Sequence, residues 1–109
     1  NDYPDYGKKV AKSVASGKDG LGILICGTGI GMSIVANKVS GVRAALVQDQ
    51  FAAQMAREHT DANLLVLGAR IVDFELAPKL VEIWLDSEFQ GDRHQRRIDK
   101  ISQLEKEDE

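Results

Sequence analysis

The sequence is poor in the residues that cross-link a chain or hold a metal ion. Its 109 residues include one cysteine, Cys26, which has no second thiol for a disulfide within the chain, so a reducing cytoplasm is the expected compartment. The two histidines, His59 and His94, lie far apart and belong to no HExxH or CxxC motif. No metal site is therefore predicted.

Long apolar runs and an excess of basic residues are also missing. No apolar stretch approaches the ~20 residues that a membrane-spanning helix requires. The 14 Lys and Arg against 17 Asp and Glu give a formal net charge of -3, whereas a nucleic-acid-binding domain is usually basic. With 43% hydrophobic and 28% charged residues, the sequence suits one globular domain over residues 1–109 that binds neither membranes nor nucleic acids.

The beginning of the sequence resembles the middle of a domain. It opens at Asn1 without a methionine and runs directly into Asp2-Tyr3-Pro4-Asp5-Tyr6. A processed or truncated chain is therefore expected.

Apolar runs typical of strands alternate with helical spacing along the sequence. Strands are predicted at 23–25, 42–47 and 64–67, and helices at 5–15, 30–40, 50–59, 76–85 and 92–104. This order predicts a three-layer, Rossmann-like α/β fold with a parallel sheet. Because only three strands are visible, further strands or a partner chain are expected to complete the sheet.

Three of these segments carry more detailed expectations. The run 23–25 does not alternate with polar residues, so it predicts a strand that is covered on both faces. Asp49 is expected to cap a helix whose apolar stripe comprises Phe51, Ala52, Met55, Ala56 and His59. Residues 105–109 are expected to form a charged, frayed tail.

A glycine-rich turn that carries the cysteine follows the first predicted strand. Gly27, Gly29 and Gly31 let the backbone turn sharply and expose consecutive N–H groups before a helix begins near Ile30. The N-terminus of a helix stabilises the thiolate form of a cysteine such as Cys26. A cysteine in this place can serve as a base that moves a proton.

Other functions of this turn would each require a particular sequence motif. A Walker A loop would end in Gly-Lys-Ser/Thr, which is missing, and a cysteine phosphatase would need an arginine where Met32 stands. The glycines follow G-x-G-x-G rather than G-x-G-x-x-G, although Asp49 occupies the place of a ribose-binding acid. Nucleotide binding and a tight turn without a ligand both stay open.

Two polar groups stand out in the second half of the sequence. His59 and Asn63 flank a polar segment just before a buried strand. Polar groups there need hydrogen-bond partners, so His59 has two possible roles, a structural histidine with its partners in the protein or a histidine that binds a ligand. Arg93 and Arg97 are four residues apart on one predicted helix, beside His94. Such guanidinium groups suit phosphate, and the alternative is a solvated face that pairs with nearby aspartates.

Taken together, these motifs resemble ribose-5-phosphate isomerase type B, whose family includes the galactose-6-phosphate isomerase subunits. The resemblance runs along the whole sequence in order. It is carried by the segments 2–6, 22–33, 36–38, 43–44, 57–59, 61–63 and 91–94.

The resemblance implies an isomerase that interconverts ribose 5-phosphate and ribulose 5-phosphate through an enediolate, without metal or cofactor. It also implies a homodimer or a dimer of dimers with active sites shared between subunits. The roles it implies are Cys26 as the base, Thr28 as a proton shuttle, His59 in ring opening, the amides of Gly27, Gly29, Ile30 and Gly31 as the anion hole, Asn63 as a pocket residue, and Arg93, His94 and Arg97 at the phosphate.

The sequence departs from the family at its front. The family opens with two further strands, a helix and an Asp-His turn at the sugar site, none of which lies in these residues. The 109 residues alone are therefore expected to isomerise poorly or not at all. A non-catalytic module that binds nucleotides or sugar phosphates, and an isomerase of allose or galactose 6-phosphate, are the alternatives.

Overall fold

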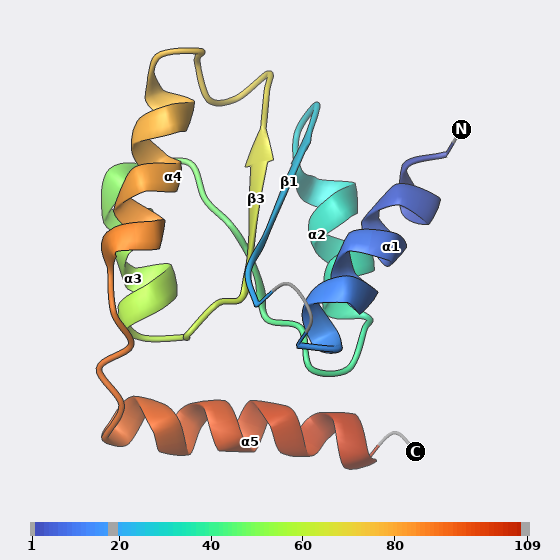
Figure 1. The fold of residues 1–109 in the computed structure, drawn as a ribbon, viewed down its shortest axis with the longest axis vertical. Helices are drawn as coiled ribbons and strands as arrows, with labels where there is room; N and C mark the ends of the chain where they lie inside the picture. The colour runs from blue at the N-terminus through green and yellow to red at the C-terminus, as the bar shows by residue number, and fades with distance from the viewer. Residues whose placement is uncertain (1, 18–19, 108–109) are drawn as a thin grey trace.

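The computed structural model describes residues 2–17 and 20–107. Helices and strands alternate along most of the chain, and a long last helix stands apart from the others (Figure 1). The elements are α1 (Tyr3–Ala15), β1 (Gly22–Cys26), α2 (Ile30–Asn37), β2 (Ala44–Leu46), α3 (Gln50–Glu58), β3 (Leu64–Gly68), α4 (Leu76–Asp86) and α5 (Arg93–Glu107).

The three strands form one parallel sheet in the order β1-β3-β2. In the register of β1 with β3, Gly22 pairs with Leu64 at one end and Cys26 with Gly68 at the other. Helices α1 and α2 pack on one face of the sheet, and α3 and α4 on the other (Figure 1). The predicted three-layer α/β fold with a parallel sheet is confirmed.

The middle strand, β3, is buried along its whole length. Its side chains alternate, so that Leu64 and Val66 join the core beneath α1 and α2, while Leu65 and Leu67 join the core beneath α3 and α4. The latter core also holds Trp84, which is fully buried. Burial of each large apolar side chain contributes about 1.5–3 kcal/mol, so β3 anchors both layers.

The strand that carries the cysteine lies at an edge of the described sheet and is covered on one face only. Leu24 is buried under α1 and α2, whereas Ile23 and Ile25 are 39% and 58% exposed. The prediction of a strand covered on both faces is therefore wrong for the described residues. The apolar run belongs to a strand whose second face stays partly exposed in the described residues.

Helix α3 begins as predicted, because the Asp49 side chain accepts a hydrogen bond from the Ala52 N–H at 2.8 Å. Its buried face runs through Ala53 and Ala56. Phe51 is 71% exposed, so its expected place on the apolar stripe is wrong. Two positions along a helix correspond to about 200° of rotation, which turns residue 51 away from the face of residue 53.

Helix α5 crosses the ends at which the strands begin (Figure 1). Only His94 and Ile98 of this helix are buried. Glu105 accepts hydrogen bonds from the Gly41 N–H with both carboxylate oxygens, at 3.1 and 3.0 Å. The expected frayed tail is therefore wrong for residues 105–107, and residues 108–109 lie outside the described part. None of the described helices is long and apolar enough to cross a membrane.

Candidate active site

The loop between β1 and α2 holds the cysteine and bends back over it. Cys26 is half-buried, and its Sγ accepts a hydrogen bond from the Gly29 N–H at 3.1 Å. The Thr28 Oγ1 accepts one from the Ile30 N–H at 3.2 Å. The first amides of α2 therefore point at the thiol and the hydroxyl, and N–H donors in this position stabilise a negatively charged sulfur or oxygen.

Glycine is required in this loop because the loop presses against the end of β3. Gly29 has a φ of +82°, and a Cβ at this position would lie 2.5 Å from the Leu46 Cδ1. On the facing strand, a Cβ at Gly68 would lie 2.4 Å from the carbonyl oxygen of Thr28. A side chain at Gly68 would force the loop away from β3, and one at Gly29 would displace the Leu46 side chain of β2, so these glycines fix where the thiol sits.

Arg70 is a site residue that the sequence analysis missed. Its N–H donates to the Gly27 carbonyl at 2.8 Å, and a Cβ at Gly27 would lie 3.7 Å from both the Cδ and the Nε of the Arg70 side chain. An exposed guanidinium group thus lies beside the thiol loop. The signal in the sequence was its place two residues after the end of a strand, at the same edge of the sheet as Cys26.

His59 and His94 come together although they are 35 positions apart in the sequence. Their rings are stacked with centroids 4.1 Å apart and an angle of 13° between the planes. His94 is 5% exposed. Burial lowers the pKa of His94 below 6.5, and the nearby charges of His59, Arg93 and Arg97 lower it further, so the neutral ring is favoured.

Arg93 and Arg97 lie in the first turns of α5 on either side of His94, and both are exposed. Among the described residues neither forms an ion pair, and the carboxylate of Asp99 accepts instead from Gln95 at 2.8 Å. Two guanidinium groups without an acidic partner, next to a stacked histidine pair, form a patch suited to an anion.

Asn63 has a structural role in this chain. Its side-chain oxygen accepts from the Arg43 N–H at 2.7 Å, and its side-chain nitrogen donates to the Gly41 carbonyl at 2.8 Å. These bonds fasten the turn before β3 to the segment before β2. Each polar atom keeps room for a second hydrogen bond, so the role of Asn63 as a pocket residue stays a prediction.

The structure gathers the expected residues into two groups at opposite ends of the sheet. We call Cys26, Thr28 and the loop glycines Gly27, Gly29 and Gly31 the thiol group; it lies where β1 and β3 end. The histidine pair with Arg93 and Arg97, here the cationic group, lies where the strands begin (Figure 1). Four steps of about 3.3 Å along β1 separate these edges by roughly 13 Å, far beyond hydrogen-bond reach. One chain does not bring the two groups together.

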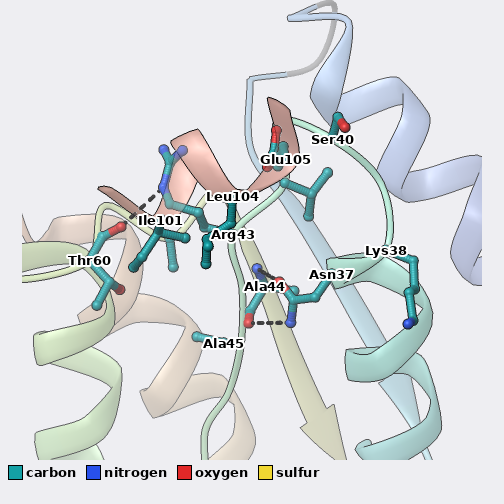
Figure 2. A pocket seen from close by; sticks show the side chains of 12 residues that line it. Asn37, Lys38, Ser40, Arg43, Ala44, Ala45, Thr60, Ile101, Leu104 and Glu105 are labelled. Atoms are coloured by element: carbon teal, nitrogen blue, oxygen red, sulfur yellow. Dashed lines mark hydrogen bonds between the residues drawn. The ribbon is translucent and has the colours of Figure 1, made fainter. Parts of the chain in front are cut away.

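A hollow of about 670 Å³ contains neither group. It lies between α5 and the free edge of β2, and Figure 2 shows Arg43 reaching the Thr60 carbonyl across it. Ile101 and Leu104 of α5, which line it, are 48% and 57% exposed. The described residues contain no group of three side chains that could hold a metal ion.

Comparison with known proteins shows the family of this chain. A family model described as Ribose/Galactose Isomerase matches residues 1–101. This chain belongs to the ribose/galactose isomerase family. Ribose-5-phosphate isomerase B of Escherichia coli is 47% identical over 104 residues, which cover 95% of this chain and 70% of that protein.

Solved structures of family members share the fold. Ribose-5-phosphate isomerase B of Clostridium thermocellum superposes with a TM-score of 0.98 at 53% identity, over 100% of this chain and 74% of that one. The enzyme of Mycoplasma genitalium, solved with bound ribulose-5-phosphate, has a TM-score of 0.94 at 51% identity, over 98% of this chain and 71% of that one. Sugar-phosphate binding is thus recorded in a close relative with the same layers.

Proposed function

We propose that this ribose/galactose isomerase family member interconverts ribose 5-phosphate and ribulose 5-phosphate. The observation that carries the proposal is the thiol loop, in which amides at the start of α2 point at Cys26 and at the Thr28 hydroxyl. An isomerase of this kind must remove a proton next to a carbonyl and stabilise the resulting oxyanion. A base beside preorganised N–H donors supplies both requirements.

The chemistry needs only a proton relay and an anion hole. The Cys26 thiolate removes the proton from C2 of the open-chain aldose, and the electron pair moves to the carbonyl oxygen on C1, which gives an enediolate. The thiol then returns the proton to C1, while the Thr28 hydroxyl passes a proton from the oxygen on C2 to the oxygen on C1. The product is the ketose, with atoms and electrons balanced, and the exposed amides of the loop hold the negative charge in between.

The cationic group supplies the remaining functions. His59 transfers protons as the furanose ring opens, and Arg93 and Arg97, with His94, bind the phosphate through charge-assisted hydrogen bonds. Arg70 adds positive charge on the thiol side. Because roughly 13 Å separates the two groups in one chain, the cationic group that serves each thiol comes from a second copy.

The assembly that we propose is therefore a homodimer, or a dimer of dimers, with shared active sites in the cytoplasm. The hollow beside α5, with the exposed Ile101 and Leu104 and the free edge of β2, is a surface that a second copy can cover.

A coupled assay with ribose 5-phosphate tests the function. We expect Cys26→Ala to abolish whatever turnover the 109 residues show, even where that turnover is low, whereas binding of ribulose 5-phosphate measured by calorimetry survives the substitution. Equal turnover by both proteins would remove Cys26 from the mechanism. Binding without any turnover by the wild type would favour a non-catalytic module, and a preference for allose or galactose 6-phosphate would change the substrate.

A further inference from the structure

The turn that follows His59 is held by two arginines through one carboxylate. Asp61 lies two residues after His59. Its side chain forms ion pairs with the Arg57 Nη2 at 2.9 Å and with the Arg43 Nη2 at 3.5 Å, and both ion pairs found in the described part of the chain end on it. The Arg57 guanidinium is itself packed over the ring of the buried Trp84, 5.9 Å from the ring centroid.

The same two guanidinium groups also hold the backbone of this turn. Arg43 donates to the carbonyl oxygens of Thr60 and Asp61, at 3.1 and 3.0 Å, and the first of these bonds is drawn in Figure 2. Arg57 donates to the carbonyl oxygen of Ala62. Three consecutive peptide groups directly after the histidine are therefore fixed by side chains from outside the turn.

The backbone at Asp61 is strained. Its φ is +47°, and the one other non-glycine residue with a positive φ in the described ranges is Asp92, at +52°. Asp61 lies two residues after His59, and Asp92 lies two residues before His94, so the two strained positions flank the stacked histidine pair. Such a backbone persists only where its surroundings fix it, and it is concentrated at functional sites.

The ring of His59 depends on this turn for its orientation. Within the described residues no hydrogen bond reaches the ring, which stacks on His94. The backbone N–H of His59 donates to the Met55 carbonyl at 2.9 Å where α3 ends, so α3 fixes the residue on one side and the turn fixes it on the other. A group that transfers a proton must be held close to the productive geometry.

From this geometry, and resting on the proposed function, we infer that Asp61 is a positioning residue whose carboxylate holds the turn that orients the His59 ring toward the furanose. Asp61 acts through His59 and touches no substrate atom. Because Arg57 belongs to α3 and Arg43 directly precedes β2, the carboxylate joins two elements at this turn. Without it, the turn is free to adopt other conformations, and the stack on His94 is loosened.

The test compares Asp61→Gly and Asp61→Asn with Asp86→Asn. Glycine adopts a positive φ without strain, so Asp61→Gly removes the carboxylate and keeps the backbone favourable, whereas Asp61→Asn removes only the charge. Asp86→Asn is the control, because Asp86 is exposed at the end of α4. Since the sequence holds two histidines, NMR resolves their ring protons, and nuclear Overhauser effects between the rings report the stack.

We expect these Overhauser effects in the wild type and in Asp86→Asn, and weaker ones with changed ring-proton shifts in both Asp61 variants. A role in stability alone would lower the melting temperature of the Asp61 variants and leave the histidine signals as they are. That result would overturn the inference, as would the absence of the Overhauser effects from the wild type. The signals require no turnover.

Activity provides the second measurement. Asp61→Gly should lower kcat for ribose 5-phosphate about 10-fold, because a displaced His59 opens the furanose slowly. In a Cys26→Ala background, its affinity for ribulose 5-phosphate by calorimetry should stay unchanged, since the phosphate of this ketose occupies the oxygen that a furanose ring would need. Equal kcat values for Asp61→Gly and Asp86→Asn would overturn the positioning role. A wild type that binds the ketose without any turnover would overturn the proposed function, whereas the histidine signals still decide whether Asp61 holds the ring.

Discussion

Gly29 carries three constraints at once: a left-handed backbone, contact with Leu46, and the amide that donates to the Cys26 sulfur. An alanine at position 29 would be strained by the positive φ, and its Cβ would lie 2.5 Å from the Leu46 Cδ1. We expect Gly29→Ala to lower the free energy of unfolding by about 2–5 kcal/mol and to reduce turnover through the displaced amide.

Gly20→Ala is the matched control for this change, because Gly20 has a φ of +72° with nothing within 4 Å of its Cβ position. It should cost only the backbone strain, about 1–2 kcal/mol. Urea denaturation measures both variants. Equal losses would mean that the contact of Gly29 with Leu46 does not hold the loop.

Arg97 should act on binding rather than on chemistry, since its guanidinium is assigned to the phosphate. Arg97→Ala should raise KM for ribose 5-phosphate about 10-fold or more, with kcat changed by less than about 3-fold. Arg96→Ala is the control, because Arg96 is an exposed arginine whose side chain is turned by about 100° around the same helix. Steady-state kinetics that fail to distinguish the two variants would argue for a general charge effect instead.

The first turn of α5 contacts the rest of the molecule through the stacked rings of His59 and His94. Burial lowers the pKa of His94 in the folded protein below its ordinary 6.5, so the unfolded chain binds more protons as the pH falls below 6.5. This contribution to stability is fully present above pH 6.5 and is lost as the pH falls from there toward the lowered pKa.

We therefore expect the urea midpoint of the wild-type chain to be lower at about pH 5.5 than at about pH 7.5, and His94→Gln to reduce this difference. His59→Gln, which leaves the buried ring in place, serves as the comparison. A wild-type midpoint that is the same at both pH values would contradict the lowered pKa.

Local sequence patterns predicted the helices and strands well. Features that depend on contacts between distant segments could not be predicted in this way. The loop from Cys26 to Gly31 could be predicted because its glycines, thiol and helix start lie within six consecutive residues. By contrast, the environment of Ile25 could not, because an apolar run is the same whether or not another segment covers it. Phe51 shows a similar limit, since several helical faces fit the same short stretch of apolar residues.

The site itself was only partly predictable for the same reason. Arg70 meets Gly27 across two strands, and the stacking of His59 on His94 depends on where α5 crosses the sheet. Neither contact leaves a pattern in the local sequence. The engagement of Asn63 with the backbone before β2 is likewise a product of the fold.

In the proposed assembly, each active site joins the thiol group of one chain to the cationic group of another. Complementation between two inactive variants tests this arrangement. A chain carrying Cys26→Ala is mixed, under conditions that allow subunits to exchange, with a chain carrying both His59→Ala and Arg97→Ala, and differently tagged chains report that mixed dimers form.

Each variant alone should be nearly inactive, because every one of its sites lacks one group. In a mixed dimer one site combines an intact thiol group with an intact cationic group, so random exchange should restore about a quarter of wild-type turnover. A mixture that contains mixed dimers but is no more active than the separate variants would contradict the shared site.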